Sequence, residues 1–182
     1  MTGKGSLNHN SRKFHAKNTD PNRTHWNVEY CNEDIKDVYH ELFDEALKRY
    51  NDKQTRKDRK IDDYYEKIRS GKQEKLFHEV IIQIGDKDNM GSETMEGQLA
   101  AKILDEYMKG FQERNPTLRV FAAHLHLDEA TPHLHIDFIP YVTGSKRGLD
   151  TRVSLKQALS SLGFKGGSRS ETELNQWVQS EK

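Results

Sequence analysis

Four histidines lie within fourteen residues of this chain, in the stretch HLHLDEATPHLHID (residues 124–137). Side chains alternate between the two faces of an extended strand, so the histidines and aspartates on either side of EATP would share one face. They are His124, His126, Asp128, His133, His135 and Asp137. The apolar residues between them would face the opposite way, into a core.

Imidazoles on two paired strands can reach a common metal ion, because neighbouring strands lie about 4.8 Å apart. His126, His133 and His135 are nearest to the connection, so we expect them to form the ligand set. For His124, one residue pair further away, a supporting or surface role is at least as good an interpretation. With no cysteine nearby, the site would stay open to water or a substrate oxygen, which favours catalysis on a carbonyl or phosphoryl group. A solvated polar strand face without metal is the alternative.

Hydrophobic periodicity predicts the elements that would position these histidines. Strands are expected over 23–30, 118–128 and 132–142, and a further strand of about ten residues is expected within 74–86. Helices are expected over 32–53, 59–71, 92–116, 152–163 and 170–182. Asn32 or Asp34 would cap the first helix, and Ser92 the third. The short connection between the last two strands forbids a parallel crossover, so they must form a hairpin. The fold class is α/β, of the α+β kind.

The composition fits one domain of 182 residues with a substantial core. The net charge is zero, but basic residues are concentrated in 1–30 and 145–169. One face of the protein can therefore be basic although the chain as a whole is neutral. The single cysteine, Cys31, excludes an internal disulfide and fits a reducing cytosol. No apolar run is long enough to span a membrane, and no signal peptide opens the chain.

Two blocks of the sequence resemble one known family. HLDEATPHLH (126–135) resembles the metal-binding motif of MobV-type plasmid mobilisation relaxases, also called the Mob/Pre or plasmid recombination enzyme family, within the HUH endonucleases. LNHNSRKFHAKNTDPNRTHWN (7–27) resembles the N-terminal block of the same family, which has a His-x-x-Arg element followed by Asn, Asp-Pro and Arg-Ser/Thr-His. The two blocks occur in the expected order, and together they are far more specific than His-x-His alone.

The resemblance implies a central antiparallel β-sheet flanked by helices. It also implies that His126, His133 and His135 hold one divalent ion, Mn²⁺ or Mg²⁺. A strand usually precedes the His-x-x-Arg block in the family, but only eight residues precede His9 here, so we expect that strand to be short, missing or formed differently. We expect residues 1–182 to be a single relaxase domain, the N-terminal part of a longer protein.

Catalytic roles also follow from the resemblance. His9 matches the histidine nucleophile of members that do not use tyrosine, and Arg12 matches a partner that contacts phosphate. Glu129 falls at an acidic position where it could orient a ligand histidine or take a proton. Rival nucleophiles are the tyrosines Tyr30, Tyr64 and Tyr65. A core-packing role is the better interpretation of the adjacent pair of tyrosines, because neighbours on a helix cannot share a face.

The basic segments would contact DNA phosphates. The expected DNA-binding residues are Lys4, Asn10, Arg12, Lys13, Arg23, Lys146, Arg147 and Arg152. For GSKRGLDTR (144–152), an ordinary solvated loop is the alternative interpretation.

The family resemblance therefore implies a DNA relaxase, an enzyme that nicks and transfers one strand at the origin of transfer of a plasmid or mobile element. It would bind an origin hairpin with its adjacent single strand, work through a 5′-phosphohistidine, and act in the bacterial cytoplasm alongside other mobilisation proteins. Two alternatives remain open. One is a metal-stabilised, non-catalytic protein that binds an origin or promoter. The other is a histidine-triad-like nucleotide hydrolase, which HLHID faintly resembles.

Overall fold

The structure is a computed structural model that describes residues 2–3, 6–168 and 170–182. The chain divides into two compact units, each made of several separate segments. The first unit comprises Met1–Glu33, His78–Arg114 and Val120–Phe138, and the second comprises Asp34–Phe77, Asn115–Arg119 and Ile139–Lys182. Every histidine of the predicted metal cluster belongs to the first unit.

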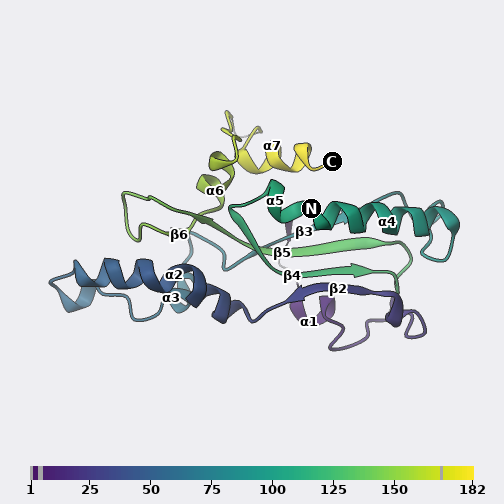
Figure 1. Cartoon of the computed structure of the whole chain (residues 1–182), viewed down its shortest axis with the longest axis horizontal. Helices are drawn as coiled ribbons and strands as arrows, with labels where there is room; N and C mark the ends of the chain where they lie inside the picture. Colours follow the sequence, from purple (N-terminus) through teal and green to yellow (C-terminus); the bar gives the residue numbers. More distant parts are fainter. Residues whose placement is uncertain (1, 4–5, 169) are drawn as a thin grey trace. The chain divides into compact units, whose positions relative to one another are not determined.

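The sheet has six described strands, five of which follow the order β1-β3-β5-β4-β2 (Figure 1). Their bounds are Thr2–Gly3 for β1, Val28–Asn32 for β2, His78–Gln83 for β3, Leu118–His126 for β4 and His133–Val142 for β5. The sixth, β6 (Arg152–Val153), pairs with the end of β5. The pairing is antiparallel, which confirms the expected antiparallel sheet and the hairpin of β4 with β5.

Alternation along β4 and β5 sorts their side chains as expected. The apolar face is buried and carries Leu125, Leu127, Leu134, Ile136 and Phe138. Burying each such side chain contributes about 1.5–3 kcal/mol. A slip of one residue would expose this whole set and turn the histidines toward the core, so the register is strongly specified.

The helices of the first unit differ from the prediction at their ends. One helix over 92–116 was expected, but α4 spans Met95–Lys109 and α5 spans Phe111–Arg114, with Gly110 between them. Thr94 is the N-cap, because its hydroxyl accepts from the Gly97 amide at 3.0 Å. Ser92 is not the cap, since its buried hydroxyl donates to the Glu129 carbonyl at 3.0 Å.

The N-terminal block is more regular than its sequence suggests. The helix α1 (Leu7–Asn10) and a 3₁₀ turn η1 (Thr24–Trp26) form within it, and β1 is a strand of only two residues. The expected strand over 23–30 is therefore wrong in its first half. The reason is tertiary: the Asn27 side chain accepts from the backbone amides of Leu127 and Asp128, which holds the turn against the end of β4.

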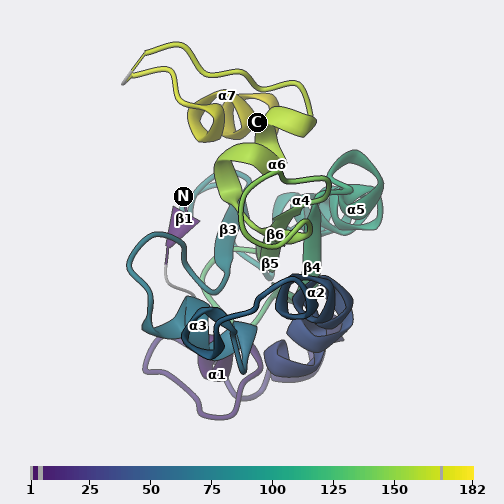
Figure 2. The same cartoon turned by 90° about the vertical axis from the view of Figure 1, so that its left-hand side faces the viewer.

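The second unit contains the remaining helices, which the sequence predicted with slightly longer bounds. They are α2 (Ile35–Asp52), α3 (Tyr64–Ser70), α6 (Leu155–Ser161) and α7 (Glu173–Ser180), with a 3₁₀ turn η2 (Lys57–Arg59). Asp34 caps α2, accepting from the Lys36 amide at 2.7 Å, as one of the two expected caps. Figure 2 shows α2 beside α3 and α6 beside α7. Among the described helices, none is long and apolar enough to cross a membrane.

Candidate active site

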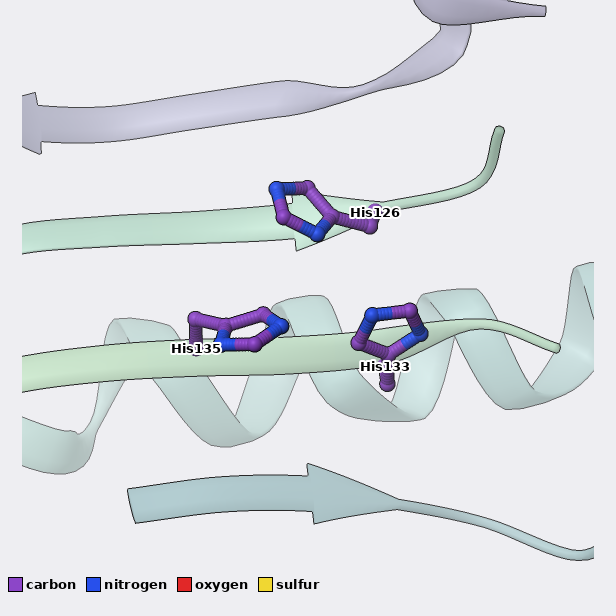
Figure 3. Close-up of side chains that lie close together, drawn as sticks. All are labelled: His126, His133 and His135. Atoms are coloured by element: carbon purple, nitrogen blue, oxygen red, sulfur yellow. The ribbon is translucent and has the colours of Figure 1, made fainter. Parts of the chain in front are cut away.

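The imidazoles of His126, His133 and His135 converge on one face of the β4–β5 hairpin (Figure 3). One ligand nitrogen of each lies within 4.8 Å of the others, and their ring centroids are 4.8 to 5.2 Å apart. All three side chains are buried. In Figure 3 a helix passes behind the strands, on the side away from the rings.

Each of the three histidines uses one ring nitrogen to bond a protein oxygen. The pairs are His126 Nε2 with the Asn10 carbonyl (2.9 Å), His133 Nδ1 with the Thr131 carbonyl (2.8 Å) and His135 Nδ1 with Glu79 Oε1 (2.7 Å). Carbonyl and carboxylate oxygens accept, so each of these nitrogens carries the proton of the neutral ring. The opposite nitrogen of each ring therefore holds a free lone pair.

These lone pairs fit a metal ion. His126 Nδ1 and His135 Nε2 are buried with no hydrogen-bond partner in the part of the chain that the structure describes. Buried polar atoms are nearly always partnered, so two unpartnered lone pairs in one cluster point to a ligand role. An outer hydrogen bond on each imidazole is the usual arrangement around a metal. Three histidines without a cysteine make an open site.

The electrostatics favour the neutral form of His126 and His133. The pKa of His126 is lowered to about 2, chiefly by burial and in part by the nearby charge of Arg12. Burial likewise lowers the pKa of His133. Metal binding needs the unprotonated ring, so the protein environment prepares the cluster for a cation.

Helix α1 brings His9 beside this cluster. Its ring centroid lies 6.0 Å from that of His126 and 6.5 Å from that of His135, and its side chain is 22% exposed. Arg12 Nη1 approaches His9 Nε2 at 3.2 Å. A guanidinium can only donate, so Nε2 is the lone-pair nitrogen of His9 and Nδ1 carries the proton.

All five N–H groups of Arg12 have partners within the protein. Nε and Nη2 donate to the two carboxylate oxygens of Asp128, Nη2 also donates to Glu129 Oε1, and Nη1 donates to the ring and carbonyl of His9. Although burial acts to raise it, the pKa of Asp128 is held at about 2, chiefly by these bonds from Arg12. The phosphate contact that we expected of Arg12 would have to displace one of these bonds.

Glu129 lies between His9 and two of the metal-ligand candidates. Its Oε1 is 3.4 Å from His9 Nε2 and 3.9 Å from both His126 Nδ1 and His133 Nε2. His9, His126 and Glu129 form a second group that could hold an ion. This position suits either role expected from the sequence, a proton acceptor or a group that orients a ligand histidine.

Asn10 requires a correction, because we expected it to contact DNA. It is 2% exposed, and its side-chain amide donates to Glu79 Oε1 at 2.9 Å and to Asp137 Oδ2 at 3.2 Å. Its carbonyl accepts from His126. A buried amide with these partners cannot reach a phosphate, and Asn10 instead joins α1 to the supports of two ligand histidines.

Glu79 is a functional candidate that the sequence analysis missed. It pairs across the strands with Asp137 and lies diagonally from His135, to which it bonds. Although burial opposes it, the bonds from His135 and Asn10 lower the pKa of Glu79, whereas burial and the Glu79 charge raise the pKa of Asp137 to about 7. A lone carboxylate in the apolar strand HEVIIQ was the signal available in the sequence.

His124 and the rival tyrosines have surroundings that favour roles other than metal ligand or nucleophile. His124 is buried, with Nε2 3.2 Å from Glu29 Oε2, which favours a supporting role. Tyr30 donates its hydroxyl to Asp105 of α4 at 2.9 Å, and burial raises its pKa, which disfavours the phenolate. Tyr64 and Tyr65 belong to the second unit, where Tyr64 is buried and packs against Phe43 of α2, in agreement with a core role.

The expected DNA-binding cations fall into different settings. Lys4 lies outside the described residues. Lys13 is exposed just after α1. Arg23 is mostly covered, because it donates to Asp20 and to the carbonyls of Leu127 and Glu129, so it holds the β4–β5 connection.

The other three expected cations line one groove of the second unit. Lys146, Arg147 and Arg152 surround it together with Lys165, and its volume is about 710 Å³. Arg152 donates to Ser145 and Gln157, whereas Lys146 and Arg147 are exposed. The groove therefore combines exposed cations with hydroxyl and amide groups, the side chains that bind phosphate oxygens.

An antiparallel sheet presents an open three-histidine cluster that could hold a metal ion, beside a histidine that is held by an arginine. A family model described as plasmid recombination enzyme (Mob/Pre) matches residues 5–176. The chain therefore belongs to the Mob/Pre family of plasmid recombination enzymes, and it is a DNA relaxase.

Solved structures of the MobM relaxase domain are similar to this chain. One, Mn-bound and in complex with a 22-nucleotide pMV158 oriT DNA, is 28% identical, with coverage of 83% of this chain and 67% of that chain and a TM-score of 0.47. Another, with a 23-nucleotide DNA, is 23% identical, with coverage of 95% and 90% and a TM-score of 0.41. No curated protein sequence matches the chain.

Proposed function

We propose that this relaxase nicks and rejoins one strand at an origin of transfer through a covalent bond between His9 and the 5′ phosphate. The observation that carries the proposal is the setting of His9. Its Nε2 lone pair lies beside the three-histidine cluster, held there by Arg12 and 3.4 Å from Glu129.

The step balances with His9 and water. The Nε2 lone pair of His9 attacks the scissile phosphorus and forms an N–P bond, while the bond from phosphorus to the 3′ oxygen breaks. The imidazole releases its Nδ1 proton to water, and the departing 3′ oxygen takes a proton from water and leaves as a hydroxyl. Attack by a 3′ hydroxyl on the phosphohistidine reverses these bond changes and reseals the strand.

Arg12 and Glu129 prepare this attack. Arg12 keeps the proton on Nδ1, because its own N–H occupies the other nitrogen. When Nε2 attacks the phosphorus, we expect Arg12 Nη1 to donate its hydrogen bond to a phosphate oxygen instead of to His9. Glu129 would accept the Nε2 proton whenever the ring is protonated, since its Oε1 is the nearest carboxylate oxygen.

His126, His133 and His135 would hold one divalent ion, which when bound polarises the phosphate as a Lewis acid. Three imidazoles suit a first-row transition ion better than Mg²⁺, which prefers oxygen ligands. Mn²⁺ is the first ion to test, because the MobM relaxase domain of the same family is Mn-bound. Mg²⁺ is the second.

The DNA would be an origin hairpin with its adjacent single strand. Lys13 and the groove lined by Lys146, Arg147 and Arg152 would bind its phosphates. We further propose that the chain is one relaxase domain of a longer, plasmid- or element-encoded protein that works in the bacterial cytoplasm with other mobilisation proteins.

The decisive experiment traps the covalent adduct on supercoiled DNA that carries the element's own origin. Wild type with Mn²⁺ should nick this DNA, and the adduct should be lost in mild acid and survive alkali, because a phosphoramidate is acid-labile. His9→Ala should bind metal and DNA but not nick. His15→Ala, at an exposed position of the same segment, should nick normally. Peptide mapping that puts the label on Tyr30, Tyr64 or Tyr65 would overturn the assignment of His9.

The same assay separates the other two functions considered. A non-catalytic origin- or promoter-binding protein would bind the DNA and leave it supercoiled. A nucleotide hydrolase of the histidine-triad kind would cleave a nucleotide substrate and leave no adduct on DNA.

A further inference from the structure

Phe14 is an aromatic side chain that stands exposed beside the proposed nucleophile. Its side chain is 51% exposed, and its ring centroid lies 5.9 Å from that of His9. Single exposed apolar residues are common on protein surfaces. Phe14 is unusual because its ring lies directly beside the imidazole of His9, the proposed nucleophile.

The backbone holds Phe14 in this place. Arg12 has a φ of 51°, the left-handed region that residues other than glycine adopt at a cost. The bonds of Arg12 to Asp128 and Glu129 maintain that conformation, and the Lys13 amide donates back to the Asn8 carbonyl at 3.0 Å. The turn therefore presents the Phe14 ring on a rigid support, next to the imidazole.

The segment that carries Phe14 also carries positive charge, since Lys13 and Lys17 are exposed on it. On the sheet, Ile81 is the cross-strand partner of His135 and is 37% exposed on the same face as the histidines. Aromatic rings between cations are the arrangement with which proteins bind single-stranded nucleic acid, since bases stack on the rings while cations follow the phosphates.

We propose that Phe14 is a stacking platform for one unpaired base of the DNA strand that His9 attacks. The proposal rests on the proposed function, because it takes single-stranded DNA as the ligand. Because the two rings are only 5.9 Å apart, the stacked base belongs to a nucleotide close to the scissile phosphate.

A binding experiment separates the bases from the phosphates. The full chain with Mn²⁺ is titrated by fluorescence anisotropy into a short oligothymidylate and into an abasic strand of the same length. Wild type should prefer the oligothymidylate. Phe14→Ala should weaken oligothymidylate binding by about 5-fold to about 150-fold, the range for loss of one stacked base, and change abasic binding by less than about two-fold.

Two substitutions test the aromatic face itself. Phe14→Trp should keep the preference for bases, and Phe14→Leu, which retains apolar bulk, should lose most of it. Leu99→Ala, a 59% exposed apolar position on α4, is the control and should behave as wild type. Calorimetric Mn²⁺ binding reports that each variant is folded, because the metal ligands are buried in the same unit.

The outcomes distinguish this inference from the function on which it rests. If Phe14→Ala binds both strands as wild type does, or weakens both equally, base stacking on Phe14 is wrong, even where the His9 adduct forms on origin DNA. If the base preference depends on Phe14 while no adduct forms on His9, the stacking site stands and the proposed nucleophile fails.

Discussion

The backbone carbonyl of Asn10 accepts the Nε2–H of His126 at 2.9 Å. The side-chain amide of the same residue donates to Glu79, which in turn accepts from His135. One residue of α1 thus supports a ligand histidine on each strand of the hairpin, directly beside His9. The nucleophile candidate and the metal cluster are therefore positioned by the same buried network.

This network predicts the effect of Asn10→Ala. The carbonyl bond to His126 would remain, but Glu79 would lose a donor and would orient His135 less well. We expect affinity for Mn²⁺ to fall by about 10- to 100-fold, as when other outer hydrogen-bond partners are removed. Calorimetric titration measures this, with Asn8→Ala as the exposed control on the same helix. An unchanged affinity in folded Asn10→Ala would show that Glu79 needs no such support.

The choice of metal ligands can be tested by comparing them with His124, the other histidine of the same stretch. Alanine at His126, His133 or His135 should each abolish strong binding of one divalent ion, because each removes one lone pair from the cluster. His124→Ala is the matched control and should reduce affinity much less, since its Nε2 bonds Glu29. Equal losses in all four variants, measured by calorimetry, would mean that the ligand set has been chosen wrongly.

The basic groove of the second unit predicts a salt effect on DNA binding. Replacing Lys146, Arg147 and Arg152 together with glutamine should reduce the slope of log affinity against log salt by about 1 for each DNA phosphate that is no longer neutralised. Metal binding should stay unchanged. A control variant removes the same charge from the exposed cations Arg56, Lys57 and Arg59. If both triple variants give the same slope, the groove does not bind DNA.

The partly buried carboxyl of Glu74 predicts that replacing it will change the stability of the protein by an amount that depends on pH. Burial raises its pKa above the ordinary glutamate value, in spite of bonds from Leu155 and Ser154 that act to lower it. A carboxyl group with a raised pKa contributes its stabilisation below the pKa of the unfolded chain and loses it as pH rises through the folded value. Ionised Glu74 is therefore unfavourable at neutral pH.

Glu74→Gln should accordingly raise the thermal midpoint at pH 7, because it removes the unfavourable buried charge. The gain should shrink as pH falls from the raised folded pKa of Glu74 toward the unfolded value of about 4.3, below which the wild-type carboxyl is protonated in both states. Glu45→Gln, at an exposed position of α2, is the control. A gain that is independent of pH would rule out ionisation of Glu74 as its cause.

The alternation of HLHLDEATPHLHID was sufficient to predict the hairpin, its buried apolar face and the convergence of His126, His133 and His135. A period of two residues and a short connection are local properties, and they leave one pairing that buries the leucines. Local periodicity likewise predicted α2, α3, α4, α6 and α7, apart from their ends, but it did not predict α1 or the break between α4 and α5. Their exact caps depended on distant groups: the hydroxyl of Ser92 is taken by the Glu129 carbonyl, so Thr94 caps α4.

Tertiary structure alone decided what surrounds the histidines. The amide of Asn10 meets partners 69 and 127 positions away, and Arg12 bonds a carboxylate 116 positions away. In the sequence these polar residues look like exposed N-terminal groups, which is why Asn10 was assigned to DNA. A polar side chain can be buried only where protein partners replace its hydrogen bonds to water. For Asn10 and Arg12 those partners are carboxylates that lie far away in the sequence, so only the tertiary structure brings them together.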